Sequence, residues 1–207
     1  MIKNILPSEI EKESFRIIRS ELKEMGKEIP AEVEPTVVRV IHTTADFEYA
    51  DTMRFSDGAV GKIKDALRAG AHIVTDTNMA LTGISKKTLE KFGGQVHCFM
   101  ADEDVAAEAK ERQVTRAIVS MEKAARLGVP TIFAIGNAPT ALLRIRELYD
   151  KEGLRPEAVI AVPVGFVNVV EAKELILDMD VPYIVNVGRK GGSTVAAAIC
   201  NSILYNM

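Results

Sequence analysis

The sequence predicts an α/β fold, a three-layer α/β/α sandwich built on a mostly parallel sheet of about five or six strands. Two observations predict it. Short runs rich in valine and isoleucine recur along the chain, as expected for strands buried on both faces. Helical segments separate these runs, and strands that alternate with helices form right-handed crossovers in a parallel sheet. We therefore expect helices on both faces of one sheet.

The expected elements follow in chain order. An amphipathic helix is expected over residues 7–25, because apolar side chains recur at helical spacing between Pro7, which suits a helix start, and Gly26, which suits a helix stop. The six expected strands are residues 36–41, 72–75, 96–99, 131–135, 158–162 and 183–187. The five further helices expected are residues 57–69, 105–127, 138–151, 169–179 and 193–204.

Length and composition favour one globular domain over residues 1–207. Hydrophobic residues make up 47% of the chain and charged residues 27%, which is sufficient for a core without a disulfide or a structural metal. The two cysteines, Cys98 and Cys200, lack metal-binding spacing and are expected to be reduced and buried. No run reaches the roughly 20 apolar residues of a membrane span, and charges begin too early for a signal peptide. We expect a cytoplasmic protein.

The net charge of −3 argues against a general nucleic-acid binder, which needs a basic surface to displace counterions. It leaves room for a local basic pocket that binds an acidic small molecule. In sheets of this kind, ligands bind beyond the carboxyl ends of the strands, so the loops after the expected strands are the place to look for chemistry. These loops contain His42-Thr43-Thr44, Asp76-Thr77-Asn78-Met79, Gly136-Asn137-Ala138-Pro139-Thr140, Pro163-Val164-Gly165-Phe166-Val167 and Gly188-Arg189-Lys190-Gly191-Gly192.

His42 follows the first expected strand. An unperturbed imidazole titrates near ~6.5, so this side chain can give or take a proton at neutral pH. A structural histidine that caps a strand accounts for the position equally well. The other two histidines, His72 and His97, fall at the wrong end of a strand or on a packed face, and we expect structural roles for them.

The turn at residues 188–192, called the glycine turn below, lies between an expected strand and an expected helix. Its glycines allow the backbone to approach a ligand closely, and the free N–H groups at a helix start favour an anion. Arg189 and Lys190 add positive charge. The turn matches neither the P-loop nor the dinucleotide-binding pattern, and a purely structural turn is the alternative. In the turn after residues 131–135, Asn137 or Thr140 either donates to a ligand or caps the helix.

The segments in these loops resemble one family closely: precorrin-8X methylmutase, also called cobalt-precorrin-8 methylmutase, of cobalamin biosynthesis. The resemblance runs nearly end to end. It rests on Val40-Ile41-His42, Asp76-Thr77-Asn78-Met79, Pro163-Val164-Gly165-Phe166-Val167 and residues 10–18, 134–142, 171–174 and 188–193. Each segment is weak by itself, but their order and spacing in a chain of this length are specific.

The resemblance implies an isomerase that moves a methyl group from C-11 to C-12 of a tetrapyrrole. The product is hydrogenobyrinate, or cobyrinate where the ring holds cobalt. The resemblance implies no S-adenosylmethionine, because the methyl group is already on the substrate, and no other cofactor, because any cobalt arrives with the substrate. It further implies a homodimer with the site near the subunit interface. From the net charge and the short apolar runs, we expect neither a nucleic acid nor a membrane as partner.

The resemblance also assigns residues. The catalytic histidine of the family corresponds to His42, with the role of proton donor to the macrocycle. Ser14 and Arg116 correspond to substrate contacts, and an arginine suits the acetate and propionate groups of such a substrate. The remaining residues that we expect to contact the substrate are Thr43, Asn137, Gly188, Arg189, Lys190, Gly191 and Gly192.

Two alternatives to the enzyme stay open. A corrinoid-binding protein of the same fold would bind the ring without changing it, although intact His42, Ser14 and Arg116 argue against this interpretation. A nucleotide-dependent α/β enzyme would use the glycine turn for phosphate, although the missing phosphate-binding patterns argue against that.

Overall fold

The computed structural model describes residues 6–207 and is an α/β sandwich. In chain order its elements are α1 (Pro7–Glu24), α2 (Glu34–Thr44), α3 (Tyr49–Thr52), β1 (Met53–Phe55), α4 (Ala59–Arg68), β2 (His72–Thr75), α5 (Asn78–Gly83), α6 (Lys86–Leu89), the 3-10 helix η1 (Glu90–Phe92), β3 (Val96–His97), α7 (Glu103–Glu111), α8 (Arg116–Ala125), β4 (Thr131–Ile135), α9 (Pro139–Glu152), β5 (Ala158–Ala161), α10 (Val169–Leu177), β6 (Tyr183–Asn186) and α11 (Ser193–Tyr205).

The six strands form one sheet in the order β1-β6-β5-β4-β2-β3. Strands β2 to β6 pair in parallel, and only the edge strand β1 runs antiparallel to its neighbour β6. The predicted fold class is therefore confirmed. Because β3 lies on one side of β2 and β4 on the other, the connections reverse direction between β2 and β4. Such a switch point opens a crevice at the carboxyl ends of the two strands.

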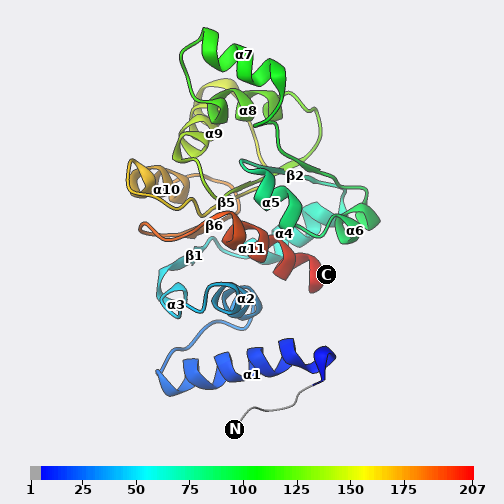
Figure 1. Cartoon of the computed structure of the whole chain (residues 1–207), viewed down its shortest axis with the longest axis vertical. Coiled ribbons are helices and arrows are strands. Elements are labelled where there is room, and N and C mark those ends of the chain that lie inside the picture. Colours follow the sequence, from blue (N-terminus) through cyan, green and yellow to red (C-terminus); the bar gives the residue numbers. More distant parts are fainter. Residues whose placement is uncertain (1–5) are drawn as a thin grey trace.

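Two hydrophobic cores sit on opposite faces of the sheet, because successive side chains of a strand point to opposite faces. In β4, Ile132 and Ala134 face one core, and Phe133 and Ile135 face the other. Helices α2, α4 and α11 contribute to the first core, and α8, α9 and α10 to the second. Figure 1 shows α1 as an outer layer beyond α2, at the opposite end of the molecule from α7.

The strand expected over residues 36–41 is wrong: this segment lies inside helix α2. Pro35 occupies the first turn, where a proline suits a helix start. The buried apolar side chains are Val37, Val38, Val40 and Ile41, which recur at helical spacing and pack between α1 and α11. The run of β-branched residues favours a strand locally, but packing of one helical face outweighs this weak propensity.

Other boundaries also differ from the prediction. The helix expected over residues 105–127 is two helices, α7 and α8, separated by a bend at Gln113 with a φ of 54°. The bend lets α7 fold back so that Val105 and Ala109 pack on Val119 of α8. The short edge strand β1 and helices α3, α5 and α6 were not predicted. No helix among residues 6–207 has the length and apolar character needed to cross a membrane.

Candidate functional site

The loops that follow β2, β4, β5 and β6 meet at one edge of the sheet, called the carboxyl edge below. Thr77, after β2, donates its hydroxyl proton to the Ser193 hydroxyl oxygen at the start of α11, at 2.8 Å. Gly136, after β4, lies so close to the same helix start that a Cβ atom would sit 2.7 Å from the Cα of Ser193. The sequence analysis predicted that the loops after the strands lie together, and this is confirmed for the loops after β2, β4, β5 and β6.

A buried carboxylate spans the switch point between β2 and β4. Asp76 is 1% exposed, and its two oxygens accept hydrogen bonds from the backbone N–H groups of Gly136, Asn137 and Ala138. Burial raises the pKa of Asp76, although these three N–H groups favour the charged form. Asp76 thus fixes the turn that begins α9 and leaves the side chain of Asn137 exposed at the carboxyl edge.

The glycine turn rests on a buried lysine that the sequence analysis did not single out. The Lys173 ammonium of α10 is 0% exposed and donates to the carbonyl oxygens of Gly188 and Lys190, both at 2.8 Å. Burial lowers the pKa of Lys173 to about 8. Helical spacing could have found this residue, because it lies four residues after Val169 and three before Ile176, on the buried face of α10.

The two cations of the glycine turn have different surroundings. The Arg189 guanidinium lies 5.4 Å from the centre of the Phe166 ring, and Phe166 is 81% exposed. The Lys190 ammonium instead binds the carboxylates of Asp46 and Glu48, which raise the pKa of Lys190. Arg189 is therefore the cation of the turn that is free of a carboxylate partner among the described residues.

His42 lies in the last turn of α2 and not at the end of a strand, so that part of the sequence prediction is wrong. Its imidazole is exposed and packs edge-on against the Phe15 ring of α1, with 5.2 Å between the ring centres. Ala45, with a φ of 54°, ends the helix. Asp46 follows at once and binds Lys190, so the end of α2 lies beside the glycine turn.

Two further predicted residues lie near His42. Ser14 precedes Phe15 on α1, and its hydroxyl donates to the Ile10 carbonyl oxygen at 2.9 Å. Thr43 donates its hydroxyl proton to the Arg39 carbonyl oxygen, also at 2.9 Å, and lines a hollow of about 230 Å³ together with Thr194 of α11. The structure therefore brings α1, the end of α2 and the start of α11 to one region.

Arg116 stands apart from this group. It is the first residue of α8, and it is exposed. The neighbouring Thr115 contacts Thr140 of α9 with 3.0 Å between their hydroxyl oxygens, which links Arg116 to the helix that Asp76 positions. Within residues 6–207, no hydrogen bond or ion pair joins Arg116 to His42 or to the glycine turn.

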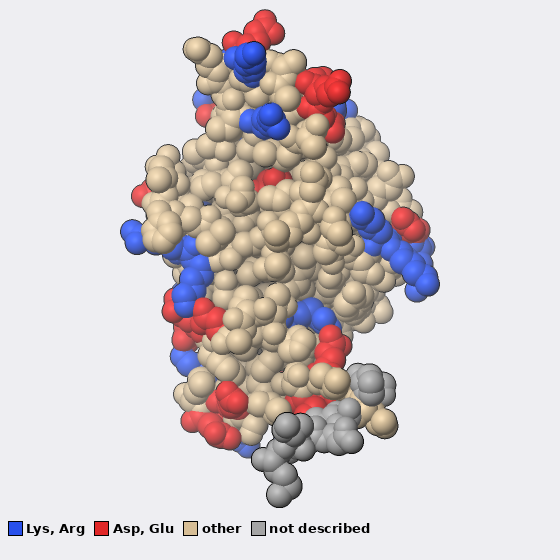
Figure 2. Space-filling view, viewed as in Figure 1, with Lys and Arg blue, Asp and Glu red and all other residues tan. Residues whose placement is uncertain are grey.

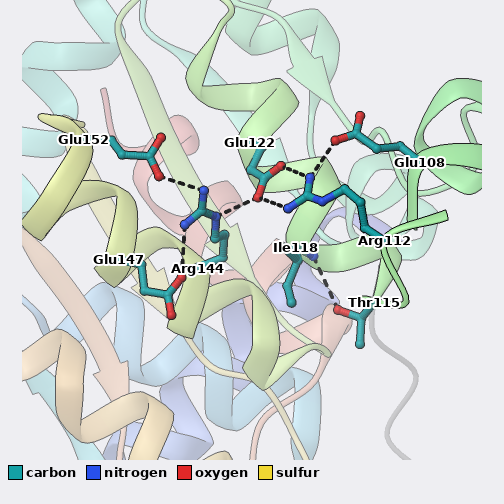
Figure 3. A network of polar contacts seen from close by, with 8 residues as sticks. All are labelled: Glu108, Arg112, Thr115, Ile118, Glu122, Arg144, Glu147 and Glu152. Atoms are coloured by element: carbon teal, nitrogen blue, oxygen red, sulfur yellow. Dashed lines mark hydrogen bonds and ion pairs between the residues drawn. The ribbon is translucent and has the colours of Figure 1, made fainter. Parts of the chain in front are cut away.

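A second polar cluster lies at the opposite edge of the sheet. Glu122 of α8 is 7% exposed and binds both Arg112 and Arg144, as Figure 3 shows. These three residues line a hollow of about 650 Å³ that also includes residues just before β4 and β5. Because the carboxylates and guanidinium groups satisfy one another, this cluster ties α7, α8 and α9 together.

The residues that the structure describes hold no group of three or more histidine, cysteine or acidic side chains arranged for a metal ion. Cys98 is half-buried and Cys200 is buried, and both are free thiols. The surface over α5 and α11 is largely uncharged, and charged side chains gather around its rim (Figure 2). An uncharged face with basic side chains at its rim can hold a flat molecule that carries carboxylates.

Comparison with known proteins decides the family. The family model for precorrin-8X methylmutase matches residues 9–206. The chain belongs to the precorrin-8X methylmutase family. It is 44% identical to the cobalt-precorrin-8 methylmutase of Priestia megaterium over 96% of this chain and 88% of that protein. It is 41% identical to the cobalt-precorrin-8 methylmutase of Salmonella typhimurium over 97% and 96% of the two chains.

A solved structure agrees with the family assignment. The precorrin-8X methylmutase of Thermus thermophilus superposes with a TM-score of 0.85 and 40% sequence identity, over 95% of this chain and 96% of that one. Members of the precorrin-8X methylmutase family are isomerases of cobalamin biosynthesis, and this chain is one of them. The family resemblance, and not strand-end reasoning, pointed to Ser14 and Arg116.

Proposed function

We propose that this chain moves a methyl group from C-11 to C-12 of precorrin-8 or of its cobalt form, which yields hydrogenobyrinate or cobyrinate. One observation carries the proposal: His42 is an exposed imidazole, held against Phe15 at the end of α2, beside the loops of the carboxyl edge. A proton donor must be within reach of its substrate, and an exposed imidazole at this edge meets that condition.

His42 acts as the proton donor to the macrocycle. Protonation draws electron density out of the conjugated ring and prepares it for the 1,5-shift of the methyl group. Holding one methyl-bearing conformer beside one proton donor supplies much of the acceleration. The migrating methyl group is already on the substrate, so the reaction uses neither S-adenosylmethionine nor a metal cofactor.

The substrate carboxylates bind around His42. Ser14 lies on α1, which packs against His42, and Thr43 follows His42 on α2. Asn137 lies in the turn just before α9. The glycine turn offers Gly188, Gly191 and Gly192 for close approach and the positive charge of Arg189. Lys190 remains a predicted contact, and its ammonium also binds Asp46 and Glu48. Arg116 binds a carboxylate at the far side of the carboxyl edge.

The active form is a homodimer with the site near the subunit interface. Exposed apolar side chains support this part of the proposal, because large apolar surfaces on a chain often mark interfaces. Ile10 is 52% exposed and Ile17 is 41% exposed on α1, while Phe166 and Val167 are 81% and 76% exposed at the carboxyl edge. A cytoplasmic location, expected from the sequence, also stays a prediction.

The test is turnover of the purified protein with metal-free and with cobalt-loaded substrate, followed by the change in absorption spectrum. We expect conversion without S-adenosylmethionine and in the presence of a metal chelator. His42→Ala is expected to abolish the methyl shift while the protein still binds the macrocycle.

His72→Ala is the matched control, because His72 lies at the opposite, amino end of the parallel strands and pairs with His97. This variant should retain activity. Full turnover by His42→Ala would exclude the proton-donor role, and binding without any spectral change in the wild type would favour the non-catalytic corrinoid-binding protein.

A further inference from the structure

Among residues 6–207, Lys173 is a buried cation without a counter-charge. Its side chain is fully buried, and within the described part of the chain no carboxylate pairs with it. Burying a charge costs free energy unless hydrogen bonds or an opposite charge compensate it. Its neighbours on the same helix face, Val169 and Ile176, are apolar, and an apolar side chain at position 173 would avoid that cost. The function of the ammonium must therefore lie in what it binds.

The ammonium binds the inner side of the glycine turn, and it does so together with a second buried side chain. Asn186, at the end of β6, is 0% exposed and donates from its amide nitrogen to the Lys190 carbonyl oxygen at 2.9 Å. The hydroxyl of Thr52 donates to the Asn186 side-chain oxygen at 2.7 Å and so sets the orientation of that amide. The carbonyl oxygens of Gly188 and Lys190 are thereby held toward the protein interior.

Because each peptide bond is planar and trans, a carbonyl group that points inward turns the next N–H group outward. In a trans peptide the C=O group of one residue and the N–H group of the next point in opposite directions, and the described residues contain no cis peptide. With the carbonyl groups of Gly188 and Lys190 turned inward, the N–H groups of Arg189 and Gly191 point outward. Neither N–H group donates to a protein acceptor within residues 6–207.

We propose that Lys173, oriented with Asn186 and Thr52, is a positioning residue that turns the N–H groups of Arg189 and Gly191 outward to bind a carboxylate of the substrate. Paired N–H groups beside a guanidinium form a concave anion site, and the free guanidinium of Arg189 lies on the same turn. Lys173 itself does not touch the substrate. This inference rests on the proposed function, because the ligand is a carboxylate group of that substrate.

The deciding experiment compares the wild type with Lys173→Met, which keeps the length of the side chain and removes its donors. A carboxylate contact that is equal in the ground state and the transition state affects binding alone. We expect KM to rise about tenfold or more, the scale of a lost charge-assisted hydrogen bond, with kcat nearly unchanged. An unchanged KM in a folded variant, or a loss confined to kcat, overturns the proposal.

Two more variants separate positioning from folding. Thr52→Val removes the hydroxyl that orients Asn186 and that also lies 3.0 Å from the Glu48 carbonyl oxygen. It should raise KM in the same direction by a smaller factor, even if Lys173→Met does not fold. Glu122→Gln is the matched control, since it also alters a buried charged residue but at the opposite edge of the sheet. It should lower stability and leave KM unchanged, and an equal rise in KM there would contradict a specific role for Lys173.

A binding readout keeps this inference distinct from the methyl shift. Titration with hydrogenobyrinate should move the backbone amide NMR signals of Arg189 and Gly191 in the wild type, and move them far less in Lys173→Met. A wild type that shows these shifts but no turnover would refute the proposed reaction and still support the positioning role. Turnover without any shift of the two signals refutes the positioning role alone.

Discussion

At the scale of single residues, two buried charges of opposite sign organise the carboxyl edge. Asp76 accepts N–H groups from the turn after β4, and Lys173 donates to carbonyl groups of the turn after β6. Each satisfies backbone groups that a loop leaves without strand or helix partners. Both turns therefore hold one conformation even though they lie in loops.

The first prediction concerns Asp76→Asn. The substituted amide can accept with only one atom, and its NH₂ group would face the N–H groups that the carboxylate now accepts. We expect a loss of about 1–3 kcal/mol in unfolding free energy, the usual cost of a buried unsatisfied donor. Urea denaturation measures it, and a variant as stable as the wild type would show that the turn rearranges freely.

A second residue-scale prediction concerns Arg116→Ala, which should weaken substrate binding. Loss of one charge-assisted contact to a carboxylate corresponds to about a tenfold or greater rise in the substrate dissociation constant. Arg126→Ala is the control, because Arg126 caps the other end of the same helix, near the opposite edge of the sheet. Equal affinity in Arg116→Ala and the wild type would remove Arg116 from the site.

At the scale of elements, helix contacts that are distant in sequence decide both the layers and their stability. Helix α2 packs between α1 and α11, and this burial overrides the strand propensity of its valines. On the other face, Glu122 joins α7, α8 and α9 through Arg112 and Arg144. The hydrogen bonds from Arg112 are the main reason that the pKa of Glu122 lies below its usual range.

The element-scale prediction is that Glu122→Gln destabilises the protein by about 1–3 kcal/mol at neutral pH, because both guanidinium groups lose their buried shared carboxylate. The loss stays in this range because Arg112 keeps Glu108 and Arg144 keeps Glu147 and Glu152. The pH dependence has a definite sign. The pKa of Glu122 is lower in the folded protein than in the unfolded chain, where it is about 4.3. The contribution of Glu122 to folding stability is therefore present above that unfolded pKa and is lost as the pH falls through the folded pKa.

Wild-type stability should accordingly fall more steeply than that of Glu122→Gln when the pH is lowered from neutral to below about 4. Thermal or urea unfolding across this range measures the difference between the two proteins. Parallel pH profiles would show that the Arg112 and Arg144 contacts contribute little to folding.

At the scale of the whole molecule, one sheet separates two cores and α1 adds a layer beyond them. The apolar side chains that remain exposed on α1 and after β5 are the basis for the proposed homodimer. Light scattering of the purified protein should report twice the 22.6 kDa mass of one chain. The mass of a single chain at working concentration would contradict the dimer.

The sequence by itself determined the alternation of strands and helices and the placement of the loops at the carboxyl edge. Strands β2, β4, β5 and β6 were predicted to within one residue, because runs buried on both faces carry an unbroken apolar signal. Motif order along the chain also indicated the family, which the comparisons confirm. The roles of Ser14, His42 and Arg116, which the same resemblance implies, stay predictions.

Only the tertiary structure decided the rest. Whether residues 36–41 form a strand or a helix depends on α1 and α11, which bury one face of that segment. The partners of Asp76, Lys173 and Lys190 lie on other elements, so local sequence contains no direct sign of them. The physical reason is common to all these cases: burial and hydrogen bonding arise from contacts between distant segments, and local propensity is weak beside them.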